Sequence, residues 1–260
     1  MLGLGTVDRS DGRPPYRQIA GLLREQIALG RLAPGEKLPS EAELIAHFGV
    51  ARMTVRQAVQ ELRGEGLVVA EHGKGVFVRS APPVRRLASD RFARRHREQG
   101  KSAFLAEAEA SGHTASVDQI RVTNEPASAE IARRLRLSDD DSNVVVRYRR
   151  YLADGRPVEI ATSYIPAAIA AGTGIAEVNT GPGGIYARIE DAGHRLAHFT
   201  EEISARMPTP DERRALEIGA GVPVMTLLRT AYDTNEVPVE FCDTVKVAHA
   251  YLLEYDVLAR

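Results

Sequence analysis

The sequence predicts an α+β protein in two parts. A small N-terminal domain of three helices and a β-hairpin precedes a larger, mostly antiparallel sheet with helices packed on it. The first eighty residues show apolar side chains at helical spacing, followed by two short apolar strands. The C-terminal part contains an internal repeat of one helix and two strands. The 260 residues suffice for two modest domains, which we place at residues 11–80 and 100–257, joined by a linker at 81–99.

Two helices are expected before residue 50. Pro15 suits the first position of a helix, where no N–H is needed, and apolar side chains then recur at helical spacing until Gly30. The Ser40 hydroxyl can accept from the amide of Glu43 while the Glu43 carboxylate accepts from the amide of Ser40, which is a capping box. This box starts a second, short helix that Gly49 ends.

A third helix begins near Arg52, and its polar residues point to nucleic acid. Its apolar stripe consists of Val55, Ala58, Val59 and Leu62. Two helices joined by a short glycine-containing turn form a helix-turn-helix. Off the stripe, in the first turns, lie the residues that such a helix presents to base edges and phosphates: Arg52, Thr54, Arg56 and Gln57. Solvated arginines on a compact fold are the alternative, which explains the ordered set less well.

A tight hairpin is expected directly after the third helix. Leu67–Val69 and Val76–Val78 have the composition of short strands, and His72–Gly75 joins them. The tip presents one cation, Lys74, between glycines that let the backbone approach DNA closely. We therefore expect a wing that touches a minor groove or a phosphate.

Residues 14–79 resemble the winged helix of the GntR family of bacterial regulators, in the run LPSEAELIAHFGVARMTVRQAVQELRGEGLVVAEHGKGVFV. The resemblance implies double-stranded operator DNA as a partner. The contacts it implies come from Ser40, Glu41, Arg52, Thr54, Arg56, Gln57, Lys74 and Gly75. Ala42 departs from the family pattern, which often has an arginine that touches DNA. Ala51 departs from it too, because a serine often caps the recognition helix there; both changes imply weaker or differently specific binding.

The linker carries an excess of positive charge. After Pro82 and Pro83, residues 85–101 hold seven cations against Asp90 and Glu98. Two interpretations stay open: a solvated segment that becomes a helix, or a second contact to phosphates that ignores base sequence.

The internal repeat covers residues 126–164 and 210–247. Each copy has a proline near a helix start, an amphipathic helix, a long strand, a turn, and a Pro-Val-Glu triplet that opens a second strand. The triplets Pro157–Glu159 and Pro238–Glu240 are equivalent. Two such units predict one mostly antiparallel sheet.

This plan resembles the ligand-sensing UTRA domain of the HutC branch of the GntR family, whose fold is similar to that of chorismate lyase. The resemblance covers roughly residues 100–257 and implies a small-molecule effector. On the strand from Val144, alternation places Arg147, Arg149 and Tyr151 on one face, and Arg149 matches a branch arginine that binds the acidic group of the effector. A row of cations can also protect a sheet edge from aggregation. The residues expected at the effector are Arg149, Tyr151, Thr162, Ser163, Tyr164, Tyr186, Glu240 and Tyr251.

Two departures bear on the class of effector. Gly183–Gly184 stands where members that bind phosphosugars tend to have a serine before the Ile-Tyr pair, and Val247–Ala248 stands where an arginine-glycine pair is frequent. Both departures disfavour a phosphosugar effector, and a carboxylate- or amide-bearing effector suits Arg149 with Glu240 equally well.

Other kinds of site are disfavoured. His194 and His198 have the spacing of helical metal ligands, but their segment favours a strand. Cys242 is the single cysteine, and its surroundings favour a buried, inert thiol. The sequence has no G-x-S-x-G, P-loop or dinucleotide fingerprint. We expect no catalytic residues, metal or cofactor. The lack of a spanning apolar run or an export signal predicts no membrane segment and a cytoplasmic protein.

The expected function follows from the two resemblances taken together. They imply a ligand-responsive, DNA-binding transcription regulator, acting as a homodimeric repressor that its effector releases from the operator. The net charge of −1 neither favours nor opposes this, since a small basic head can hide in the average. A lyase-like enzyme that uses the C-terminal pocket is the main alternative, because fold does not fix function. A regulator that binds DNA without any ligand is the other.

Overall fold

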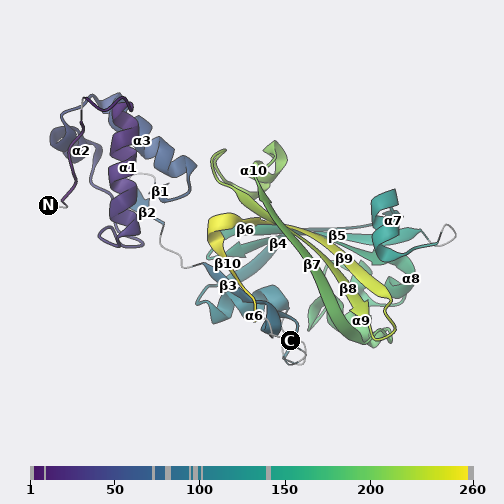
Figure 1. Ribbon diagram of the computed structural model, residues 1–260. Helices are drawn as coiled ribbons and strands as arrows, with labels where there is room; N and C mark the ends of the chain where they lie inside the picture. The colour runs from purple at the N-terminus through teal and green to yellow at the C-terminus, as the bar shows by residue number, and fades with distance from the viewer. Residues whose placement is uncertain are drawn as a thin grey trace. The chain divides into compact units, whose positions relative to one another are not determined.

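The computed structural model describes residues 3–8, 10–71, 74–79, 83–93, 95, 99–100, 102–138 and 142–256. The chain divides into two compact units (Figure 1): unit 1 contains residues 1–82 with 218–222, and unit 2 contains residues 83–217 with 223–260. None of the described helices is both long enough and apolar enough to cross a membrane.

Unit 1 is the expected winged helix. Its elements are α1 (Pro15–Ala28), α2 (Glu41–Phe48), α3 (Arg52–Gly64), β1 (Val68–Glu71) and β2 (Gly75–Val78). The antiparallel strands β1 and β2 pair from Val68↔Val78 to Glu71↔Gly75. The apolar stripes of the three helices meet in one core, where Ile19, Val55 and Leu62 are fully buried.

The helix ends follow the side chains that the sequence places there. The capping box of α2 is present: the Ser40 Oγ accepts from the Glu43 N at 3.3 Å, and the Glu43 Oε2 accepts from the Ser40 N at 2.8 Å. Gly49 ends α2 in the left-handed conformation, with φ of 61°. Ala51 is the N-cap of α3 and offers no side-chain hydrogen bond to it.

Unit 2 is built on a six-stranded antiparallel sheet in the order β4-β5-β6-β9-β8-β7. Its strands are β4 (Ala115–Pro126), β5 (Asn143–Ala153), β6 (Arg156–Pro166), β7 (Leu196–Arg206), β8 (Val224–Asp233) and β9 (Pro238–Val247). The two repeat copies meet at the β6–β9 pair, so each strand of one half has a counterpart in the other. This confirms the mostly antiparallel sheet with helices.

Helices cover both faces of this sheet (Figure 1). One face carries α6 (Ala103–Ala110), α8 (Ala167–Ala170), the 3-10 turn η2 (Gly174–Ala176) and α9 (Gly184–Asp191). The other carries the repeated helices α7 (Ala129–Leu135) and α10 (Pro210–Leu216). The α7 face encloses a small core of Ile131, Leu135, Val144 and Phe241.

A small parallel sheet was not expected from the sequence. It joins β3 (Val84–Leu87), which lies in the segment predicted as the linker, to the late strand β10 (Tyr251–Glu254). The short helix α4 (Ala88–Arg91) follows β3, and the 3-10 turn η3 (Ala248–Ala250) precedes β10. Of the charged residues in the predicted linker segment, Arg94, Arg97, Glu98 and Lys101 lie outside the described residues.

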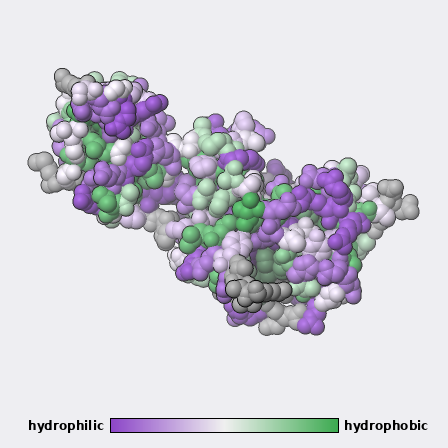
Figure 2. Space-filling view, viewed as in Figure 1, coloured by the Kyte–Doolittle hydropathy of each residue, from purple (hydrophilic) through white to green (hydrophobic). Residues whose placement is uncertain are grey.

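The surfaces of both units are mostly hydrophilic on the face shown in Figure 2. Apolar residues lie between the polar ones in small groups.

Candidate functional site

The first turns of α3 present the polar residues that the sequence analysis singled out. Arg52, Arg56 and Gln57 are exposed, and Thr54 is half-buried. They lie off the buried stripe of Val55, Ala58 and Leu62. The helix begins without a side-chain cap, so its first N–H groups and its dipole add positive character at this end.

The start of α2 supports one of these arginines. The Arg56 Nε donates to both oxygens of the Glu41 carboxylate, at 3.0 and 3.1 Å. The Ser40 hydroxyl donates to the Glu43 Oε2 at 2.7 Å. In the structure, therefore, Glu41 positions Arg56 and Ser40 caps α2.

Lys74 lies exposed in the turn of the wing, next to Gly75. Gly75 has φ of 127°, and a Cβ there would lie 2.6 Å from the Cε of Lys37. Lys37 forms an isolated antiparallel bridge with Phe77, so a second cation lies beside the wing. The sequence analysis missed Lys37, which precedes the recognised run and carries no pattern of its own. His72 and Gly73 lie outside the described residues.

Unit 2 contains a cavity of about 290 Å³ on the face of the sheet that carries α9. Its charged wall residues are Arg91, Arg147, Arg149, Glu159, Arg229 and Glu240, and its aromatic ones are Phe92, Phe104, Tyr151 and Tyr186. The structure thus brings together four residues expected at the effector: Arg149, Tyr151, Tyr186 and Glu240.

Two further expected residues reach the cavity wall through hydrogen bonds. The Ser163 Oγ donates to the Glu240 Oε1 at 2.6 Å and accepts from the Arg149 guanidinium. Tyr251 lies behind Glu159, and its hydroxyl donates to the Glu159 Oε2 at 2.6 Å.

Thr162 and Tyr164 do not line this cavity. Alternate residues of a strand point to opposite faces, so Ser163 faces the cavity while its two neighbours face the other side. Tyr164 packs there against Phe241, with ring centroids 6.0 Å apart, in the core under α7. Both residues were expected at the effector, and the pleat of β6 removes them from this candidate site.

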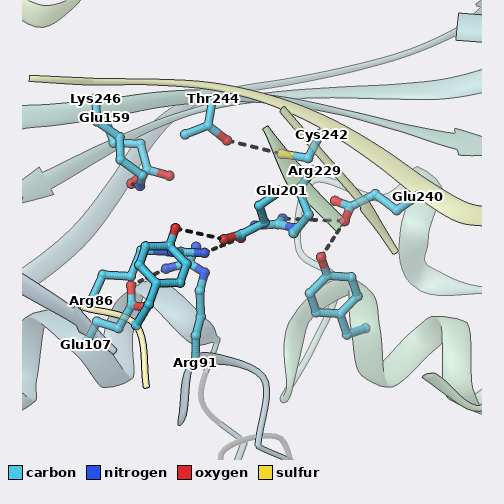
Figure 3. Close-up of polar contacts among 12 residues, drawn as sticks. Arg86, Arg91, Glu107, Glu159, Glu201, Arg229, Glu240, Cys242, Thr244 and Lys246 are labelled. Carbon is cyan, nitrogen blue, oxygen red and sulfur yellow. Dashed lines mark hydrogen bonds and ion pairs between the residues drawn. The ribbon is translucent and has the colours of Figure 1, made fainter. Parts of the chain in front are cut away.

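Glu240 is fully buried and is held by three donors. These are the Ser163 hydroxyl, the Tyr186 hydroxyl and the Arg229 guanidinium, the last at 3.5 Å. Figure 3 shows Arg229 extending toward the Glu240 carboxylate. Burial raises the pKa of Tyr186 well above its ordinary value, so its phenol stays protonated and donates.

Arg149 is a wall cation that has unused hydrogen-bonding capacity and no carboxylate partner among the described residues. One of its N–H groups donates to Ser163, while its Nε is buried and has no hydrogen-bond partner. Within the described part of the chain, no carboxylate oxygen lies within 4 Å of its guanidinium. A guanidinium has five N–H donors in a planar fork, so Arg149 retains donors for a carboxylate in the cavity.

Arg147 has a different task. It is 2% exposed, and it donates to the carbonyl oxygens of Ile175, Glu177 and Val178. Burial and the charge of Arg149 lower the pKa of Arg147 to about 10, which still leaves it charged near neutral pH. It fastens the loop after η2 that forms part of the cavity rim.

The rest of the wall charge is paired. Figure 3 shows Lys246 beside Glu159 and Arg91 beside Glu107, and both are hydrogen-bonded ion pairs. Burial raises the pKa of Glu159, but the charges of Lys246 and Arg91 outweigh it and hold the pKa at about 2. With Arg229 set against Glu240, the uncompensated wall charges are those of Arg147 and Arg149. The cavity therefore favours an anion.

Sequence reasoning missed Arg91, Glu159, Arg229 and Lys246. The repeat contained a usable signal for Glu159, because it occupies the same place in its Pro-Val-Glu triplet as Glu240. Arg91 lies in a short helix of the predicted linker, where composition indicates only charge.

The residues considered for metal or thiol chemistry have ordinary partners. His194 precedes β7, and its Nδ1 lies 2.8 Å from the Asp233 Oδ2. Cys242 is buried and contacts the hydroxyls of Ser163 and Thr244, at 3.5 and 3.4 Å. Among the residues that the structure describes, no three His, Cys, Asp or Glu side chains are grouped as a metal site.

Comparison with known families agrees with this architecture. Residues 15–78 match the family described as bacterial regulatory proteins, gntR family. Residues 110–251 match the UTRA domain, which is more than half of the chain.

Whole-length relatives give the same result. The chain is 32% identical over 249 residues to an uncharacterised HTH-type transcriptional regulator of Streptomyces coelicolor, SCO4628, covering 94% of this chain and 92% of the relative. It is 28% identical to the histidine utilization repressor of Pseudomonas putida, covering 86% and 84%. The structure of PhnF from Mycobacterium smegmatis shares the fold, with a TM-score of 0.61 at 24% identity, over 93% of this chain and 99% of PhnF. The chain therefore belongs to the GntR family of transcription regulators, in the HutC branch, with a DNA-binding winged helix and an effector-binding UTRA domain.

Proposed function

We propose that this regulator is a homodimeric repressor that leaves its operator when a small acidic molecule binds in the cavity of unit 2. The observation that carries the acidic class is Arg149, a cation on the cavity wall that retains free donors and has no carboxylate within 4 Å among the described residues. The name of the Pseudomonas putida relative, histidine utilization repressor, supports repression.

The proposed division of labour follows the boundaries 11–80, 81–99 and 100–257. The first segment binds DNA, the second connects, and the third binds the effector. The protein acts where bacterial operators lie, in the cytoplasm. The cavity acts as a sensor rather than as a catalytic site, since its carboxylates Glu159 and Glu240 are held in buried networks with cations and hydroxyls.

On the DNA side, two copies present two α3 helices to half-sites about 34–36 Å apart. Arg52, Thr54, Arg56 and Gln57 approach base edges and phosphates, with Glu41 fixing Arg56. Lys74 and Gly75 place the wing tip on the backbone. Ser40 starts α2 beside them.

On the effector side, the Arg149 guanidinium binds a carboxylate with two parallel hydrogen bonds. Ser163, Glu240 and Tyr186 fix the far side of Arg149. Tyr151 provides an aromatic wall, backed by Phe104 at a ring distance of 4.7 Å, and Tyr251 acts through Glu159.

The DNA surface is tested with the double variant Arg52→Ala/Arg56→Ala in mobility-shift assays on an operator selected in vitro. We expect binding to fall at least tenfold, because each arginine supplies charge-assisted hydrogen bonds. Arg63→Ala, at the far end of the same exposed helix, is the matched control and retains wild-type shifts. Wild-type binding by the double variant would refute the proposed surface.

The effector class is tested by thermal-shift screening of the full chain against small carboxylates, phosphates and neutral sugars. We expect stabilisation by carboxylates above all. Stabilisation by neutral sugars alone would contradict the assignment of Arg149, and stabilisation by none of the compounds would favour a regulator without a ligand.

A further inference from the structure

One residue at the start of α3 has a chemistry that the proposed DNA contacts do not use. Met53 is the second residue of the helix and is 63% exposed. Among the described residues up to position 79, only Met53 and Leu29 are large apolar side chains that stay exposed. A single exposed apolar residue is ordinary on a protein surface, so its place on the helix has to decide what it does.

The helical geometry aims Met53 away from the core. Successive residues turn about 100° around a helix axis, and the buried stripe of α3 consists of Val55, Ala58 and Leu62. Met53 therefore lies nearly opposite that stripe, at the centre of the exposed face. Arg56 and Gln57 lie one turn further along and flank it. When the N-terminal end of a recognition helix enters a major groove, this central position meets the edges of the base pairs.

The thioether side chain determines what Met53 can recognise there. It has no N–H or O–H to donate to a phosphate or to a base, and it is apolar, unbranched and adaptable. Of the groups that base pairs present in the major groove, the C5-methyl of thymine is the apolar one. The neighbouring polar residues can read donors and acceptors, but none of them selects a methyl group as well.

We propose that Met53 is a specificity-determining residue that reads the methyl group of one thymine in each operator half-site. The inference rests on the proposed DNA-facing role of α3 and adds a base preference to it. It assigns Met53 a contact that depends on base sequence, whereas a phosphate contact would not.

The test removes only the methyl group. An operator is selected from random duplexes with the full-length protein, and each thymine of a half-site is then replaced in turn by 2′-deoxyuridine, which pairs identically. Dissociation constants are measured by fluorescence anisotropy at one fixed salt concentration, since phosphate contacts vary with salt. For the wild type we expect about fourfold weaker binding per half-site at one thymine, the effect of burying about one methyl group.

Two variants connect that loss to Met53. Met53→Ala should bind the thymine and deoxyuridine duplexes equally. In a fresh selection, Met53→Gln should favour adenine, because an amide can bond to adenine with two hydrogen bonds. Leu29→Ala is the matched control, and it should retain the wild-type discrimination. Positions 53 and 29 are both exposed, so circular dichroism should show all three variants folded.

The outcomes separate this inference from the proposed DNA surface. Equal binding of all deoxyuridine duplexes by the wild type, or unchanged discrimination by Met53→Ala, overturns the role of Met53. Neither result affects the Arg52→Ala/Arg56→Ala test. If that double variant binds as the wild type does, α3 is not the reading element and the proposal for Met53 fails with it.

Discussion

Lys246 is a buried cation that stabilises unit 2 through its ion pair with Glu159. It is 1% exposed, and its Nζ donates to the Glu159 Oε2. Removing this cation leaves the buried Glu159 carboxylate without its ion-pair partner, and breaking a buried ion pair on one side typically costs about 3–5 kcal/mol. We therefore expect Lys246→Met to lower the free energy of unfolding by about that amount, as measured by chemical denaturation of the full chain.

The double variant Lys246→Met/Glu159→Gln distinguishes the lost pair from a packing defect. It removes both charges and leaves the Tyr251 hydroxyl with an amide oxygen as acceptor. We expect it to regain much of the lost stability, because no uncompensated charge remains in the core. If the double variant is less stable than the single one, the loss comes from packing rather than from the charge on Glu159.

At the same scale, strand alternation and family positions each predicted cavity residues, and Tyr186 and Glu240, suggested by family position, do line the cavity. Alternation along β5 placed Arg149 and Tyr151 together, and both line the cavity. A family position alone suggested Tyr164, and the strand pleat turns it to the opposite face. The repeat could have added Arg229, because aligning the turns 153–156 and 233–236 pairs it with Arg149. Its role becomes visible only once folding brings it beside Glu240.

The helix α3 lacks a side-chain cap at its N-terminus, so a substitution there can stabilise it. Its N-cap, Ala51, has the extended backbone of a cap but offers no side-chain acceptor to the first N–H groups. A serine at this position should stabilise the helix by about 1 kcal/mol. We expect Ala51→Ser to slow hydrogen exchange of α3 amides about fivefold, measured by mass spectrometry. Exchange in α2, which already has its capping box, serves as the internal control. Unchanged exchange rates in α3 would show that the missing cap at Ala51 does not limit the local stability of the helix.

A histidine that precedes each copy of the repeat in the chain holds the hairpin turn of that copy. His113, just before β4, lies 2.7 Å from the Asp154 carboxylate, and His194, before β7, lies 2.8 Å from that of Asp233. Both aspartates lie where the two long strands of their copy turn. In each half, this contact fastens the start of the edge strand to the neighbouring hairpin turn, a feature that the sequence repeat did not reveal.

Asp233 gives this contact a measurable pH dependence. Burial raises its pKa, but hydrogen bonds from His194 and the amides of Val237 and Asn235 outweigh it, so the pKa is lowered. An aspartate whose pKa is lower in the folded than in the unfolded protein stabilises the fold at pH values above its unfolded pKa. This stabilisation is lost as the pH falls below about 4. We expect Asp233→Asn to lower the free energy of unfolding by about 1.5–3 kcal/mol at pH 7. This gap in stability between the variant and the wild type should become smaller as the pH is lowered.

Thermal unfolding at pH 7 and near pH 3 measures this gap. Asp191→Asn is the control, because Asp191 is exposed and its ion pair with Arg188 lies on the surface of the same helix. A gap that stays constant across this range would mean that the charge of Asp233 does not stabilise the hairpin.

At the scale of the whole molecule, the elements predicted from the sequence are those whose side chains repeat at short, regular spacing along the chain. Helical spacing, a capping box and strand alternation predicted the winged helix and the main sheet. The parallel pairing of β3 with β10 was not predicted from the sequence, because each strand has only four residues and the two strands come from distant parts of the chain. The charged networks around the cavity were not predicted either. Their ion pairs Arg86–Glu201 and Arg91–Glu107 join segments that no sequence pattern connects.

The proposed function requires the effector and the operator to oppose each other, and Arg149 tests this coupling. If an acidic effector weakens operator binding by some factor, the operator must weaken effector binding by the same factor. We expect Arg149→Gln to bind the operator as the wild type does. It should bind the best carboxylate of the thermal-shift screen about 10- to 100-fold more weakly, the usual effect of losing charged hydrogen bonds. Calorimetry gives the effector affinity with and without operator, and anisotropy gives the reverse pair. Arg121→Gln, on an exposed position of β4, should leave all four constants unchanged. If Arg149→Gln releases the operator at wild-type effector concentrations, the acidic group binds elsewhere. If the effector leaves the operator affinity of the wild type unchanged, the two sites are not coupled and the proposed release mechanism fails.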